Sequence, residues 1–262
     1  MSNQKSRADR ARHAYLSRDK KSANEVHQKK IIHKSIHKEE HKTSFNLPEI
    51  ILGGQDGLVN VLGIILGVAA ATSDVKIVIV AGLSAAFAES VSMAAVAYTS
   101  KLAEADYYQS EYEREKWEIE NMPVGEREEI KALYENYGFS GRTLDEIIDR
   151  ITADKKVWLK VMMEQELKLE PVDRKSVLST AILVGFSAIV GSLIPLMAFF
   201  FLPIKTATYI SLLLTSLTLF FVGYYKAKTT LGRNLLIQGI EMMIIGMISA
   251  LVGYLVGSLF EI

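Results

Sequence analysis

Two groups of side chains in this sequence have the types and spacing to bind a metal ion. The first group, Asp56, Glu89 and Met93, lies inside long apolar runs. An Asp near the centre of a membrane helix is about 2.5–3.5 kcal/mol unfavourable, so a carboxylate there indicates function. A methionine alone usually packs, but beside two acids its thioether is a soft ligand for a transition metal, which Mg²⁺ or Ca²⁺ would not need.

The second group lies in a polar stretch. Glu115 and Glu118 are three residues apart, as are Glu126 and Glu129, so each pair shares one face of a helix. A short turn between the two helices lets the pairs face each other. Three residues further along the chain complete the set: Met162, Met163 and Glu166. Facing carboxylates bind metal in helical bundles, but acidic helix faces are usually solvated, and spacing alone leaves both interpretations open.

Five apolar spans position the first group. They cover about 47–72, 77–99, 177–202, 206–226 and 235–260, and each is long enough to cross a bilayer. The turn at 71–76 is short, so the second span returns antiparallel beside the first and brings Glu89 and Met93 to the depth of Asp56. The predicted fold is therefore an all-α, polytopic membrane protein with five transmembrane helices.

The polar insert, residues 100–175, is expected to be three helices. The first continues the second span without Gly or Pro to about Asn121, the second covers Glu126 to about Glu135, and the third runs from a capping box at Thr143 to about Leu169. Lys and Arg are concentrated in segment 1–46, in the insert and in loop 226–233, which predicts a cytoplasmic side for all three. The expected domains are 1–46, 47–99, 100–175 and 176–262.

The N-terminal segment, residues 1–46, is basic, with twelve Lys and Arg and all five His of the chain. It has no apolar run typical of a secretory signal peptide. His33, His37 and His41 follow at helical spacing, with Glu40 beside the last. This stripe indicates either metal capture or a basic helix against anionic lipid headgroups.

Several classes of function are excluded by what the sequence lacks. There is no cysteine, and no phosphate-binding loop, His-Glu-x-x-His or Gly-x-Ser-x-Gly motif. Basic residues are not interleaved with aromatics, which argues against nucleic-acid binding. We therefore expect neither an enzyme nor a prosthetic group. Glu241, in the last span, is either a proton-handling group or an interfacial carboxylate.

Several motifs in order resemble the vacuolar iron transporter family, which includes yeast and plant vacuolar iron and manganese carriers. Gly54-Gln-Asp-Gly-Leu58 and Ala88-Glu-Ser-Val-Ser-Met93, followed by Tyr98, resemble its first two spans. The helix leaving the membrane and the insert also follow the family pattern, at Lys101, Glu104, Asp106, Tyr108, Glu111, Arg114, Glu115, Glu118, Glu126, Glu129, Met162, Met163 and Glu166. This sequence departs from the family pattern at Val96-Ala97, where many members carry Gly-Gly or Gly-Glu. The difference affects the metal selectivity that the resemblance implies.

The resemblance implies a homodimer in which metal passes between the two first spans. Family members move Fe²⁺, and often Mn²⁺, out of the cytosol in exchange for protons, into a vacuole or out of the cell. By the resemblance, Asp56 and Met93 are ligands in the transport path and Glu89 is a proton or metal group there. The seven insert residues collect cytosolic metal as substrate, without a prosthetic group.

Two other classes of function remain open on sequence grounds. One is a membrane-anchored metal-storage or ferroxidase-like protein, which the lack of His in 100–175 disfavours, because di-iron bundles usually use Glu-x-x-His. The other is a membrane scaffold, which leaves Asp56 and Glu89 unexplained. The sequence predicts contact with lipid, divalent ions and protons, in either a plasma or a vacuolar membrane.

Overall fold

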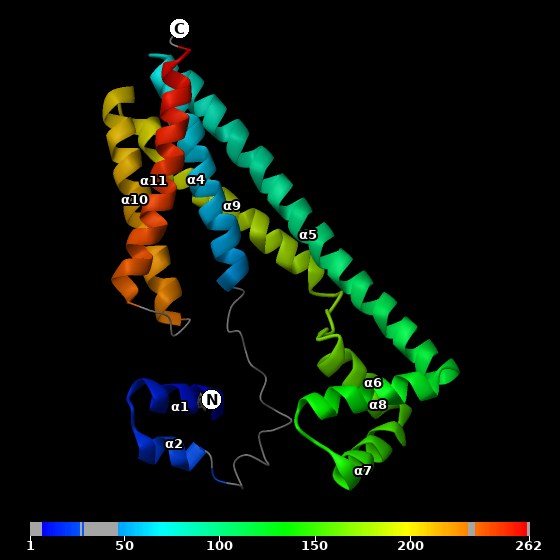
Figure 1. The fold of residues 1–262 in the computed structure, drawn as a ribbon. Helices are drawn as coiled ribbons and strands as arrows, with labels where there is room; N and C mark the ends of the chain where they lie inside the picture. Colours follow the sequence, from blue (N-terminus) through cyan, green and yellow to red (C-terminus); the bar gives the residue numbers. More distant parts are fainter. Residues whose placement is uncertain (1–6, 27, 29–46, 230–233, 261–262) are drawn as a thin grey trace, which may run out of the picture. The chain divides into compact units, whose positions relative to one another are not determined.

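The computed structural model describes residues 7–26, 28, 47–229 and 234–260, and in these the regular structure is helical throughout (Figure 1). The chain forms two units, Met1–Leu47 and Pro48–Ile262. The first contains α1 (Arg7–Leu16) and α2 (Lys20–Val26). The carboxylate of Asp19 accepts hydrogen bonds from the backbone N–H groups of Lys21 and Ser22, which caps α2. The His33, His37, His41 and Glu40 stripe lies outside the described residues.

Five long apolar helices form the membrane part of the second unit, and they confirm the predicted fold class. Their bounds are α4 Leu47–Ala71, α5 Val75–Asn121, α9 Val177–Phe201, α10 Ile204–Thr229 and α11 Leu235–Ser258. Residues 72–74 separate α4 from α5, and residues 202 and 203 separate α9 from α10. Asp74 caps α5 by accepting a hydrogen bond from the backbone N–H of Lys76 at 2.8 Å.

Glycines let α4 pack closely on two neighbours. A Cβ atom at Gly57 would lie 2.3 Å from the carbonyl oxygen of Ala188 on α9, and one at Gly257 on α11 would lie 1.9 Å from the carbonyl oxygen of Gly67. Small residues allow such backbone contact between membrane helices. The helix that carries Asp56 is therefore held by α9 and α11.

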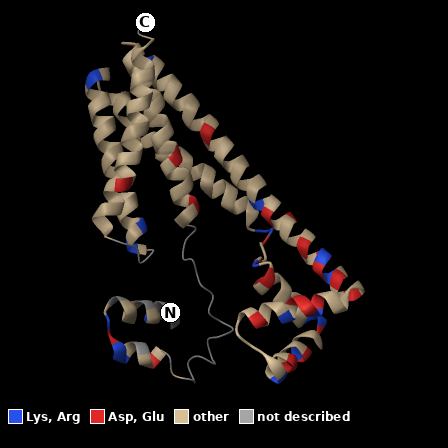
Figure 2. Ribbon diagram, in the orientation of Figure 1, with Lys and Arg blue, Asp and Glu red and all other residues tan. Residues whose placement is uncertain are grey.

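The α5 helix is 47 residues long and changes character along its length. Its first half packs in an apolar cluster with α4 and α9, where Val78 and Ala86 are buried. Its second half is acidic, and Figure 2 shows that Asp and Glu concentrate there and in the helices that follow. No Gly or Pro occurs between Gly82 and Pro123, so nothing breaks the helix where its composition changes.

The helices that follow α5 are α6 (Pro123–Asn136), α7 (Gly141–Thr152) and α8 (Lys155–Val161), and α8 continues into one π-helical turn, η1 (Met162–Glu166). The prediction of one helix from Thr143 to Leu169 was wrong. The helix begins after Ser140 and ends at Thr152, and Asp154 caps a new helix through the backbone N–H of Lys156 at 2.8 Å.

A second apolar cluster packs these helices on the far end of α5. Its buried residues are Ile119, Ile130, Leu144, Ile148, Trp158, Leu159, Met162 and Met163. The segment that returns to α9 is joined to α5 by an ion pair between Arg174 and Asp106. The insert therefore has its own core, which fixes α6 and η1 beside the acidic face of α5.

Candidate metal sites

The transmembrane site lies between α4 and α5. The side-chain amide of Asn60 on α4 donates a hydrogen bond of 2.6 Å to Oε1 of Glu89 on α5, and the other oxygen, Oε2, is buried without a partner. Asp56, one turn before Asn60, is close enough to Glu89 for the two carboxylates to interact electrostatically. Met93 lies half-buried on α5, one turn beyond Glu89. Two antiparallel helices thus bring two acids together inside an apolar bundle.

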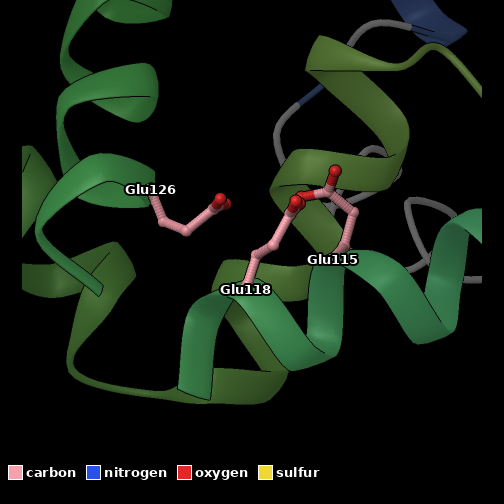
Figure 3. A group of neighbouring side chains, drawn as sticks. All are labelled: Glu115, Glu118 and Glu126. Carbon is pink, nitrogen blue, oxygen red and sulfur yellow. The ribbon is translucent and has the colours of Figure 1, made fainter. Parts of the chain in front are cut away.

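The insert site is formed by two helices that reverse direction at Pro123. Glu115 and Glu118 come from α5 and Glu126 from α6, and one oxygen of each lies within 4.8 Å of the others. Figure 3 shows Glu126 projecting toward the carboxylates of the other two. Glu115 is 1% exposed and Glu126 is 4% exposed, yet Oε2 of each has no hydrogen-bond partner. A divalent cation bound between these oxygens would supply the missing interactions.

Two further carboxylates act on this cluster electrostatically. Burial raises the pKa of Glu115 to about 7; Arg114 opposes this shift, and the carboxylates of Glu166, Glu118 and Glu129 add to it. Burial, together with Glu115 and the other acids, likewise raises the pKa of Glu126 to about 7. The pKa of Glu166 is also raised, first by desolvation and then by Glu129. Electrostatic repulsion of this kind acts over short distances, so the carboxylates of the insert lie close to one another.

The π-helical turn positions the remaining residues of the set. The backbone N–H of Leu167 donates to the carbonyl of Met162, five residues earlier, at 3.0 Å. This wide turn follows α8 and carries Met162 and Met163, which are buried in the core of the insert, and Glu166, whose carboxylate reaches the acidic cluster. Such turns are frequent at functional sites.

Comparison with known proteins assigns the chain to a protein family. The model of the VIT family matches residues 47–258, which includes all five long helices and the whole insert. The chain belongs to the VIT family. It is 30% identical to "Vacuolar iron transporter 1" of Tulipa gesneriana over 220 residues, which are 83% of this chain and 89% of the relative. It is 31% identical to "Vacuolar iron transporter" of Plasmodium falciparum over 259 residues, 94% of each chain.

Membership of the VIT family supports a metal transporter that is integral to a membrane, in agreement with the five apolar helices. In this VIT-family chain the structure brings Asp56 to Glu89, and Glu115 to Glu118 and Glu126. Glu241 is exposed on α11.

Sequence reasoning missed two residues of these sites. Asn60 was not singled out, although it lies four residues after Asp56 on the same helical face, where an amide is unusual in an apolar span. Arg114 entered only through the family pattern, yet its guanidinium forms ion pairs with Glu115 and Glu118, at 2.6 and 2.5 Å. In both cases the signal was a polar residue one turn from a candidate ligand.

Proposed function

We propose that this protein exports divalent transition metal, Fe²⁺ and also Mn²⁺, from the cytosol in exchange for protons. The observation that carries the proposal is the contact between Asp56 and Glu89 inside the membrane bundle. A metal ion requires both carboxylates deprotonated, so its binding releases protons, and reprotonation from the far side expels it. Two alternating arrangements of the helices then exchange metal for protons without a nucleotide.

The exposed face of α4 supports a homodimer with the path between the two copies of this helix. Asn60, Leu52 and Ile64 are exposed on α4 in the single chain. A polar side chain exposed to lipid is unfavourable even when it is paired, as this amide is with Glu89, whereas at a helix–helix interface it would face polar groups of a second α4. In this arrangement Asp56 and Met93 of both subunits are ligands along one path, and Glu89 handles protons or metal.

The insert supports a collecting role on the cytosolic side. Its Lys and Arg content supports a cytosolic position by the positive-inside rule. Its clustered carboxylates, with Met162 and Met163 in the adjoining core, support a site for a divalent transition metal. Metal bound by the insert reaches the membrane path along α5. The membrane is a vacuolar membrane or a plasma membrane, as in the export routes known for the family.

Metal-driven proton flux in liposomes tests this function. We would compare wild type with Asp56→Ala and with a variant in which Glu115, Glu118, Glu126 and Glu129 are all replaced by Ala. Flux should vanish with Asp56→Ala and be slowed in the glutamate variant. If wild type moved neither metal nor protons under any gradient, transport would be ruled out. Oxygen consumption during Fe²⁺ binding would then indicate an oxidase instead.

A further inference from the structure

Arg114 occupies the ligand oxygens of the insert site. From one position on α5 its guanidinium contacts three glutamates: Nη2 lies 2.6 Å from Oε1 of Glu115, Nη1 lies 2.5 Å from Oε2 of Glu118, and Nε and Nη2 lie 3.1 and 2.9 Å from Oε2 of Glu111. Glu115 and Glu118 belong to the cluster that brings three carboxylates within 4.8 Å, and Glu111 does not. The arginine thus joins two candidate metal ligands to one carboxylate outside the cluster.

A metal ion and this guanidinium compete for the same carboxylates. Arg114 donates a hydrogen bond from Nη1 to Glu118 and forms an ion pair through Nη2 with Glu115, and the charge of a divalent cation bound between Glu115, Glu118 and Glu126 would repel the guanidinium. Oε2 of Glu115 and Oε2 of Glu126 are already buried without partners, so they are available to the metal from the start. Metal entry therefore weakens the ion pair between Arg114 and Glu115 by charge repulsion and competes with the hydrogen bond from Nη1 to Oε2 of Glu118.

The surroundings of Arg114 allow that movement. Its side chain is 44% exposed, so its charged head can turn toward water without being buried elsewhere. The hydrogen bond to Glu111 is donated by Nε, whereas the one to Glu118 is donated by Nη1. The Nε hydrogen bond can therefore persist when Nη1 leaves Glu118. Glu111 is half-buried on the same helix, one turn away, and gives the arginine a partner in the metal-bound state.

We infer that Arg114 is a displaceable counter-ion that sets the metal affinity of the insert: it holds Glu115 and Glu118 in the empty site and moves onto Glu111 alone when a divalent cation enters. The inference rests on the proposed metal-collecting role of the insert. A site that passes its cargo on benefits from a competing cation, because the arginine returns as the metal leaves.

Opposite effects of two substitutions test the inference. Full-length protein in detergent at pH 8 would be titrated with Mn²⁺, and the loss of the electron paramagnetic resonance signal of the free ion would report binding. Arg114→Gln should tighten binding about tenfold, since the charge-assisted hydrogen bond to Glu118 and the ion pair with Glu115 no longer compete with the metal. Glu111→Gln should weaken it by a similar factor, because the displaced arginine loses its alternative partner. The double variant should match Arg114→Gln, since Glu111 acts only through the arginine.

Three controls keep the result unambiguous. Arg142→Gln removes an exposed arginine of the insert that pairs with Glu146, outside the cluster, and should leave the affinity unchanged. Circular dichroism checks that each variant is folded, and the transmembrane site is common to all of them. Glu126→Gln removes a candidate ligand of the insert. The difference between its Mn²⁺ titration and that of wild type identifies the Mn²⁺ that the insert binds.

The outcomes separate the inference from the proposed function. If Glu126→Gln binds Mn²⁺ as wild type does, the insert does not bind metal at this cluster. That result overturns the inference and the proposed collecting role of the insert, while transport through Asp56 and Glu89 is tested separately by the flux in liposomes. If Glu126→Gln weakens binding but Arg114→Gln weakens it too or leaves it unchanged, the arginine is a scaffold for the carboxylates, and only the inference is overturned. A double variant that resembles Glu111→Gln would also overturn it.

Discussion

Glu115 and Glu126 hold protons at pH values where ordinary glutamates are ionised. Burial and neighbouring acids raise the pKa of each to about 7. Metal binding needs both groups ionised, so below pH 7 each bound metal ion has to displace about two protons, and the affinity falls as the pH falls. Proton competition is therefore built into the site by the fold.

The pH dependence of metal binding is the measurable consequence. The Mn²⁺ affinity of the full-length protein should be nearly constant above about pH 8 and fall roughly tenfold to a hundredfold per pH unit below pH 7. Titrations at pH 6, 7 and 8 measure this. Glu126→Gln should bind more weakly and show a shallower slope, because one titrating ligand is gone. An affinity independent of pH would contradict the raised pKa values.

At the residue scale, the clustering of candidate ligands was predictable from the sequence and the partners of these residues were not. Glu115, Glu118 and Glu126 stand at spacings that place them on facing helices, and the structure brings them together. Arg114, with acids three residues before and four after it, has the sequence pattern of an exposed ion pair on one helix. Only the turn at Pro123 and the packing of α6, which bury Glu115 and Glu126, place the arginine beside a cluster of buried carboxylates.

At the element scale, the π-helical turn η1 sets which residues share the inner face after α8. Deleting Gln165 should restore ordinary helical spacing and move Glu166 from three residues after Met163 to two, about 100° further around the helix. We expect Mn²⁺ affinity to fall to that of Glu166→Gln while the helix content is kept, as measured by titration and circular dichroism. Gln165→Ala, which keeps the chain length, is the control and should bind as wild type does.

Contact between α4 and α9 gives a second prediction at this scale. A Cβ atom at Gly191 would lie 2.1 Å from the carbonyl oxygen of Gly54, so Gly191→Ala should separate the two backbones and destabilise the protein by about 1–3 kcal/mol. Gly125→Ala is the matched control, because nothing lies within 4 Å of its added methyl group. Thermal unfolding in detergent should show a lower midpoint for the first variant and an unchanged or higher one for the second.

Helix ends were predictable where Gly, Pro or a change in hydropathy marks them. The α5 helix runs unbroken to Asn121 as expected, and Pro123 begins α6 at a position that proline favours. The break after Thr152 was missed because no Gly or Pro stands there. Capping by Asp154 and the packing of Ile148 and Trp158 in one core decide it, and tertiary contacts of this kind are not visible in a local sequence pattern.

At the scale of the whole molecule, one helix contributes to both candidate metal sites, with Glu89 in its apolar half and Glu115 in its acidic half. If the insert collects cargo and the bundle moves it, Glu118→Gln with Glu126→Gln should raise the KM for Mn²⁺-driven flux about tenfold and leave kcat nearly unchanged. Flux measured at low and saturating Mn²⁺ separates the two parameters. A fall in kcat like that of Asp56→Ala would place the insert glutamates in the transport step itself.

Exposed glutamates of the insert provide the control for that experiment. Glu128 and Glu146 form surface ion pairs with Lys131 and Arg142, and neither belongs to the acidic cluster. Their replacement by Gln changes the net charge by the same amount as Glu118→Gln with Glu126→Gln. KM and kcat should both stay at their wild-type values, which would assign the effect to the cluster and not to the overall charge.

The unbroken length of α5 also has a mechanical consequence. The part beyond residue 99 extends for about 22 residues, or roughly 33 Å at 1.5 Å per residue, and lacks the Gly or Pro at which helices bend. It therefore acts as a lever arm: a tilt of about 5° in the bilayer displaces its tip by roughly 3 Å, more than the length of a metal–oxygen bond. If the protein transports metal as proposed, rocking of the membrane segment would therefore displace the carboxylates of the insert, and loading of the metal would be coupled to opening of the path.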